Sequence, residues 1–149
     1  MLCLLQICVF PVATYGCEAW TLNKTVAKRI TSFELKCYRR VLRIPWTARK
    51  TNQEVLRTIN VQEGWLLNTI LKKKLAFFGH IKRHNGMERV LLEGMIEGNR
   101  GKGRPRRRWT KDIQKCLRMS LEEAEQLAQD RGEFKRSIGK TTFWKEYVT

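Results

Sequence analysis

The stretch from Trp65 to His84, WLLNTILKKKLAFFGHIKRH, determines the fold that we expect for this chain. Its apolar residues recur every three or four positions, which is the period of one face of a helix. They are Leu67, Leu71, Leu75, Phe78 and Ile81, with Ile70 beside them. The positions between them hold Lys72, Lys73, His80 and Arg83. The pattern predicts an amphipathic helix that buries one face in a core and presents a basic face to solvent.

A second amphipathic helix is expected between Asn23 and Ile44. Its apolar positions are spaced four, three, four, four and three apart: Val26, Ile30, Phe33, Cys37, Val41 and Ile44. Thr21 or Asn23 can cap its start, and Pro45 prevents its continuation because the residue before a proline is pushed out of the helical region. Its basic residues fall largely on the other face. They are Lys28, Lys36, Arg39, Arg40 and Arg43.

Shorter helices surround these two. Thr51 with Glu54, and Ser120 with Glu123, form capping boxes that begin helices reaching about Ile59 and Ala128. The second of these helices can extend to Ile138 with a weak point at Gly132, and a further helix is expected over 107–119. Residues 89–98 show no helical period and are expected to be extended or to form a small hairpin.

These elements predict a mainly α fold, a small helical bundle with one extended or hairpin segment and a basic loop between the helices. We expect three parts: an apolar segment over 1–22, a basic helical region over 23–136 and a tail over 137–149. The first 15 residues are apolar, but no Lys or Arg precedes Lys24, and Pro11 interrupts the run. A buried helix or strand is therefore expected there, and neither a signal peptide nor a membrane partner. Five cysteines without a CxxC pair suggest reduced thiols inside a cell.

Positive charge is concentrated in the middle of the chain. The formal net charge is +16, and residues 24–108 alone hold 22 basic and 6 acidic residues, which gives the same net value. Residues 1–23 carry −1, and residues 109–149 carry +1, which is typical of an ordinary solvated surface. Such an imbalance exceeds what solubility requires and favours a polyanionic partner, RNA or DNA.

The loop RGKGRPRRR, residues 100–108, has six basic residues in nine positions. Its KGRP core resembles an AT-hook, in which glycine allows close approach, arginine suits a narrow minor groove and proline keeps the strand extended. General phosphate binding and a nuclear address signal are alternative readings. The nucleic-acid-binding residues that we expect are Arg100, Lys102, Arg104, Arg106, Arg107, Arg108, Lys72, Lys73, Arg83, Arg39, Arg40 and Arg43.

No catalytic centre is expected in this chain. Metal-dependent nucleotidyl transfer needs closely placed carboxylates, but the two aspartates, Asp112 and Asp130, are eighteen residues apart in different expected helices. His80 and His84 have a spacing that can share a metal, yet further ligands would have to come from distant cysteines, so we expect no metal and no cofactor. The tryptophans can either stack on bases or anchor helix ends in the core.

Several ordered blocks resemble one family. They are PVATYGCEAW (11–20), CYRRVLRIPW (37–46), KKKLAFFGHIKRH (72–84), LEGMIEGNRGKGRPRRRW (92–109) and SLEEAEQLAQDR (120–131). Together they resemble the C-terminal, post-thumb region of the endonuclease and reverse transcriptase of animal non-LTR (LINE-type) retrotransposons. Some members carry a Cys/His zinc knuckle in this region, but the histidines here lack clustered cysteines, and we do not transfer that site.

The resemblance implies a noncatalytic part of an RNA-directed DNA polymerase that grips template RNA or target DNA, with the polymerase domain as a further partner. It implies that the apolar residues 1–22 are a remnant of the polymerase thumb. On this basis we expect a truncated copy or a partial gene product, located inside the cell and in the nucleus. The alternative is a host chromatin or protein-interaction module derived from a dead element.

Overall fold

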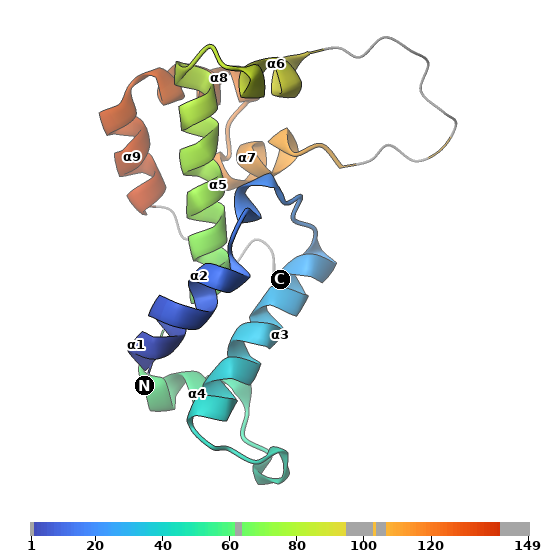
Figure 1. The fold of residues 1–149 in the computed structure, drawn as a ribbon, viewed down its shortest axis with the longest axis vertical. Helices are drawn as coiled ribbons and strands as arrows, with labels where there is room; N and C mark the ends of the chain where they lie inside the picture. The colour runs from blue at the N-terminus through green and yellow to red at the C-terminus, as the bar shows by residue number, and fades with distance from the viewer. Residues whose placement is uncertain (1, 62–63, 95–102, 104–106, 141–149) are drawn as a thin grey trace. The chain divides into compact units, whose positions relative to one another are not determined.

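The computed structural model describes residues 2–61, 64–94, 103 and 107–140. Within these ranges every regular element is a helix (Figure 1). The mainly α fold predicted from the sequence is therefore confirmed. The described residues divide into two compact units: those within 2–17 and 22–71 form the first, and those within 18–21 and 72–140 form the second. This division falls within a long helix, and the expected boundaries at 22/23 and 136/137 stay predictions.

The first unit begins with a helical segment made of α1 (Leu2–Leu4), a π-helical stretch (Leu5–Val9) and α2 (Phe10–Ala13). A short 3-10 turn, Cys17–Ala19, follows, and its last two residues already belong to the second unit. Next come α3 (Lys24–Val41), a 3-10 turn (Trp46–Ala48) and α4 (Asn52–Ile59). The helix α5 (Trp65–Arg83) contributes its residues up to Leu71 to this unit and the remainder to the second.

Local capping signals place the helix starts in this unit. The Asn23 side chain accepts a hydrogen bond from the Val26 amide at 2.7 Å, which makes Asn23 the N-cap of α3. Thr51 and Glu54 form both bonds of the predicted capping box at the start of α4. In one of these two bonds the Thr51 amide donates to the Glu54 carboxylate, which lowers the pKa of Glu54.

The core of the first unit is built around Phe10, Tyr38 and Trp65. The Phe10 ring meets Tyr38 edge-on at 6.2 Å between centroids and lies 5.4 Å from Trp65. The buried Glu34 carboxylate accepts from the Tyr38 hydroxyl at 2.9 Å and from the Leu66 amide at 3.2 Å. Burial raises the pKa of Glu34, because the charged form loses its hydration.

The buried face of α3 differs from the predicted one. The expected stripe through Val26, Ile30 and Phe33 is only partly covered, and Phe33 keeps 40% of its surface exposed. The residues that become buried are Ala27, Glu34, Leu35 and Tyr38. The helix turns this face inward because Tyr38 and Glu34, although polar, find partners in Phe10 and Leu66. Periodicity of apolar residues alone could not detect this face.

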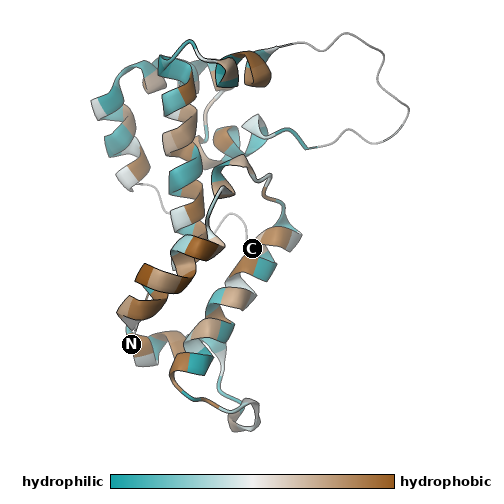
Figure 2. Cartoon of the chain, in the orientation of Figure 1, coloured by the Kyte–Doolittle hydropathy of each residue, from teal (hydrophilic) through white to brown (hydrophobic). Residues whose placement is uncertain are grey.

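The N-terminal helical segment has an exposed apolar face. Leu4, Ile7 and Val12 expose 62%, 71% and 78% of their surfaces, although Leu5 and Phe10 are buried. Figure 2 shows continuous hydrophobic colour along α1 and α2. We expected a buried helix or strand here. The segment is helical, and only one of its faces is buried. Among the described residues, no helix is both long enough and apolar enough to span a bilayer.

The second unit contains the C-terminal part of α5, then α6 (Met87–Glu93), α7 (Thr110–Leu117), α8 (Leu121–Gln129) and α9 (Arg131–Lys140). The predicted stripe of α5 is confirmed here, since Leu75 and Phe78 are fully buried. They share the core with Ile113, Ala124 and Phe134. The predicted capping box of Ser120 with Glu123 begins α8.

Two predictions for this unit were wrong in part. Residues 89–93 are helical in α6, and residues 95–98 of the expected extended segment lie outside the described residues. This helix buries none of its described residues, so no apolar face is required and periodicity could not reveal it. Arg89 and Glu93 form an ion pair across one turn of the helix, at 3.1 Å. The break near Gly132 instead falls at Asp130, whose carboxylate accepts from the Gly132 and Glu133 amides and begins α9.

Candidate nucleic-acid interface

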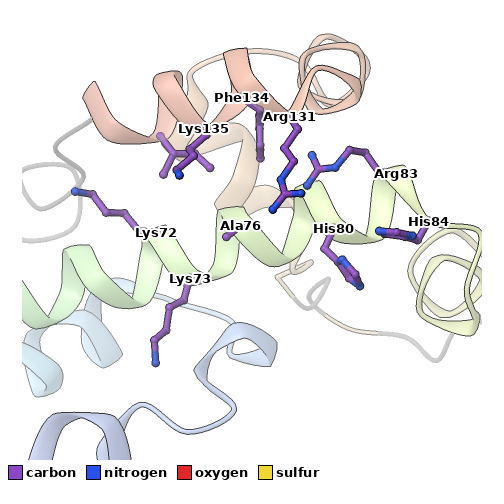
Figure 3. Close-up of a pocket in the computed structure, with 10 residues that line it drawn as sticks. Lys72, Lys73, Ala76, His80, Arg83, His84, Arg131, Phe134 and Lys135 are labelled. Carbon is purple, nitrogen blue, oxygen red and sulfur yellow. The ribbon is translucent and has the colours of Figure 1, made fainter. Parts of the chain in front are cut away.

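The basic groove of the second unit lies between α5 and α9 (Figure 3). Its volume is about 590 Å³. The cationic lining consists of Lys72, Lys73, Arg83, Arg131 and Lys135, and the remaining lining residues are Ala76, His80, His84, Phe134 and Ile138. No acidic residue of the described chain lines it. The arrangement combines an apolar floor with five cations, which suits an anionic ligand that also has apolar surface.

Gly79 allows the two helices to approach closely. A Cβ atom at Gly79 would lie 2.6 and 2.8 Å from two ring atoms of Phe134, distances that side chains do not adopt. Phe134 is 2% exposed and packs against Phe78, with 6.3 Å between ring centroids. The absence of a side chain at Gly79 therefore provides the space in which Phe134 fixes α9 beside α5.

The two arginines of the groove come from different helices. Arg83, in the last turn of α5, donates from Nη1 to the Ala128 carbonyl at 2.7 Å, which fixes its guanidinium at the end of α8. Arg131 is the first residue of α9, directly after the Asp130 cap. Figure 3 shows both side chains pointing into the space between α5 and α9. Guanidinium groups form paired hydrogen bonds to phosphate oxygens, and one anion could engage both.

His80 and His84 lie one turn apart at the Arg83 end of the groove. Their ring centroids are 4.4 Å apart with an angle of 44° between the planes, and both side chains are exposed. In the described residues no group of three or more metal-ligating side chains occurs, so the structure places no third ligand beside them. The two rings form an exposed aromatic surface next to the cations.

A buried ionic cluster supports this part of α5. Lys74 and Asp112 form an ion pair in which both side chains are almost completely buried, and Arg107 pairs with the other oxygen of Asp112. The Lys74 ammonium also donates to the Trp20 carbonyl and lies 4.9 Å from the centre of the Trp109 ring. Burial lowers the pKa of Lys74, while its hydrogen bond to Asp112 acts in the opposite direction.

Lys82 holds α6 and α8 to the end of α5. Its ammonium group pairs with Glu93 of α6 and, at 2.7 Å, with Glu125 of α8. The hydrogen bond from Lys82 lowers the pKa of Glu93, and a second bond from Arg89 acts in the same direction. Lys74 and Lys82 thus have structural partners, whereas the cations of the groove lie on a different side of α5.

The predicted binding residues are distributed as follows. Lys72, Lys73 and Arg83 line the groove, as do both histidines, although Lys73 and His80 point away from α9 (Figure 3). Arg39 donates to the Lys50 carbonyl and to Asn52, so it connects α3 with the start of α4, while Arg40 and Arg43 are exposed in the first unit. Arg107 pairs with Asp112, and Arg108 is exposed. Arg100, Lys102, Arg104 and Arg106 lie outside the described residues.

Sequence reasoning missed two of the groove residues, Arg131 and Lys135. They belong to the nearly neutral stretch 109–149, which suggested an ordinary solvated surface. They are four positions apart, which places both on one face of a helix, and this spacing was the one sign in the sequence that they could act together. Both aspartates have structural roles, since Asp112 belongs to the buried cluster and Asp130 caps α9. Trp109 donates its indole N–H to the Glu18 carbonyl at 2.7 Å and anchors the start of α7.

Comparison with known proteins gives one relative of note. The chain is 31% identical over 146 residues to a transposon-derived protein of Caenorhabditis elegans, a match that covers 90% of this chain and 52% of the worm protein. The chain therefore spans about half the length of this curated relative. No family model and no solved structure matches the chain. The similarity indicates a transposon origin.

Proposed function

We propose that the chain is a noncatalytic nucleic-acid-binding region derived from the reverse transcriptase of a non-LTR retrotransposon, and that the groove between α5 and α9 contacts template RNA or target DNA. The observation that carries this proposal is the lining of the groove, which includes five Lys and Arg residues and, among the described residues, no acidic one. The net charge of +16 and the similarity to a transposon-derived protein support it.

The proposal assigns no catalysis to the described residues. Two-metal nucleotidyl transfer requires carboxylates that are free to hold divalent ions. Asp112 is fully buried between two cations, and Asp130 accepts two backbone bonds at the start of α9. Primer extension with an RNA template and magnesium tests this part: the purified chain is expected to extend no primer, and extension by the chain would contradict it.

A pair of matched double variants tests the binding site. Arg131→Gln/Lys135→Gln removes two exposed cations of the groove, and Lys111→Gln/Arg136→Gln removes two exposed cations of the same unit that do not line it. The net charge falls equally in both. In a fluorescence anisotropy titration at low salt we expect the groove variant to lose at least about tenfold in affinity, through two lost phosphate contacts. An equal loss in both variants would show that charge alone, without the groove, determines binding.

A protein-interaction module derived from the same transposon is the second candidate. The apolar face of the N-terminal segment, with Leu4, Ile7 and Val12 exposed, favours it. Under this reading the groove double variant keeps its cellular protein partners and the chain shows no measurable affinity for RNA or DNA. Affinity for a polynucleotide that depends on Arg131 and Lys135 would decide for the first candidate.

A further inference from the structure

We infer that the groove between α5 and α9 selects single-stranded polynucleotide, with backbone phosphates at Arg83 and Arg131 and an unpaired base against His80 and His84. This inference rests on the proposed function and specifies the form of its ligand. It does not distinguish RNA from DNA, because the chemistry it uses, phosphate and an exposed base face, is common to both.

The apolar lining of the groove favours a single strand over a duplex. The apolar part of the lining consists of Ala76, Ile138 and Phe134, of which Phe134 is only 2% exposed. A duplex offers phosphates and sugars on its outside and keeps the faces of its bases stacked inside, so it has little apolar surface to place on such a lining. A single strand can turn its bases outward while its phosphates stay in contact with the cations at the edge.

The two arginines provide a site for a backbone phosphate. The Arg83 guanidinium is held by its bond to the Ala128 carbonyl, so it is positioned before a ligand arrives. Arg131 follows directly after the cap of α9, which places its backbone at the edge of the groove, and its side chain is exposed. The two side chains converge in the groove from opposite helices (Figure 3). A phosphate between them could accept from both, which a flat basic surface on one helix cannot offer.

The histidine pair provides an aromatic surface for an unpaired base. The two rings contact each other at 4.4 Å between centroids and remain exposed. Histidine is among the side chains on which unpaired bases stack. Stacking on an aromatic side chain changes affinity by about 5-fold to 150-fold per base.

The length of the groove limits the strand that it can contact. Lys72 and Arg83 are eleven residues apart on α5, which corresponds to about 16 Å at 1.5 Å per residue. Phosphates are spaced by about 3.4 Å along the axis of a stacked strand and lie further apart in an extended one, so the groove spans at most about five phosphates.

The test compares an oligouridylate, an oligothymidylate and a DNA duplex of equal length as anisotropy probes for the full chain. We expect at least one of the two single strands to bind about tenfold more tightly than the duplex, and whichever binds better identifies RNA or DNA as the ligand. If the duplex binds as tightly as both single strands, the inference is overturned while the proposed function stands. If no polynucleotide binds, both fail. Polyglutamate of equal charge is expected to compete poorly, and equal competition would overturn the inference.

Histidine variants separate stacking from charge. His80→Ala/His84→Ala is expected to lower the affinity for the single strand by about 5-fold or more and to leave the weaker duplex binding unchanged. His80→Phe/His84→Phe keeps two aromatic rings and is expected to restore single-strand binding. Both residues are exposed, so the unfolding transition followed by circular dichroism should match that of the wild type. Single-strand binding that survives His80→Ala/His84→Ala, or that the phenylalanine variant fails to restore, would overturn the assignment of the base to this pair.

Discussion

Replacement of Gly79 by alanine tests the contact on which the groove depends. The new methyl group would stand 2.6 and 2.8 Å from ring atoms of the buried Phe134 and 3.0 Å from Nη1 of Arg83. Either the ring or the whole of α9 must shift. Overpacking of this kind costs about 1–3 kcal/mol, and the gain in helix propensity from glycine to alanine offsets about 1 kcal/mol of it. We therefore expect Gly79→Ala to lower the free energy of unfolding by about 0–2 kcal/mol.

Gly139→Ala provides a matched control in α9. It makes the same substitution at the second-to-last residue of α9, where a Cβ atom would have nothing within 4 Å. We expect it to raise the free energy of unfolding by at most about 1 kcal/mol, because the gain is smaller at a helix end than in its interior. The two variants should consequently differ by about 1–3 kcal/mol in urea denaturation followed by circular dichroism, with Gly79→Ala the less stable. Equal stability, or a more stable Gly79→Ala, would refute the packing of Phe134 on Gly79.

The same substitution has a consequence for binding. Gly79→Ala leaves the net charge unchanged but moves Phe134 and Arg83, two residues that line the groove. We expect its affinity for a single strand to fall, whereas Gly139→Ala should bind like the wild type. Gly79→Ala/Phe134→Leu replaces the ring by a smaller side chain and is expected to recover part of the stability. A double-mutant cycle without coupling between these two positions would contradict the contact.

Three further predictions concern stability and are checked by urea denaturation. Asp112→Ala leaves the Lys74 ammonium buried without its carboxylate and is expected to cost about 3–5 kcal/mol; a loss below about 1 kcal/mol, the range of an exposed pair, would contradict the buried cluster. Burial raises the pKa of Glu34 above its ordinary value of 4.5. The folded wild type therefore binds a proton more readily than the unfolded chain, and it becomes more stable as the pH falls through the raised pKa. At neutral pH this gain is absent. Glu34→Gln is therefore expected to stabilise the protein by roughly 1 kcal/mol at neutral pH and by less in acid. If the variant's extra stability increased in acid, the pKa of Glu34 would be lowered in the folded protein and not raised. Ser120→Ala removes the cap of α8 and should cost about 1 kcal/mol; an unchanged transition would show that the capping box contributes nothing.

Elements determined by local sequence were predictable. The buried stripe of α5 follows from the spacing of its apolar residues, and both capping boxes form where Thr51 and Ser120 precede a glutamate by three positions. Such signals act within one or two turns of the chain. The helix α6 was missed because it buries nothing, and the face of α3 was misplaced because it buries Glu34 and Tyr38.

The groove itself could be predicted only in part. Lys72, Lys73 and Arg83 follow from the basic positions of α5, but Arg131 and Lys135 join them through the contact of Gly79 with Phe134, which lie 55 residues apart. The sequence also gives no sign that Lys74, the last of the three consecutive lysines, is buried against Asp112 while Lys72 and Lys73 line the groove. Charge and periodicity identify which residues are basic; long-range packing decides which of them share a surface.

The salt dependence of single-strand binding tests the central claim most directly. The affinity of a single strand falls with a slope of about −0.7 per neutralised phosphate in a plot of log affinity against log salt, so five groove cations predict a slope near −3.5. Arg131→Gln/Lys135→Gln should reduce its magnitude by about 1.4, to near −2, while Lys111→Gln/Arg136→Gln should leave the wild-type slope unchanged. Binding that ignores salt, or slopes that change equally in the two double variants, would contradict a phosphate-binding groove between α5 and α9.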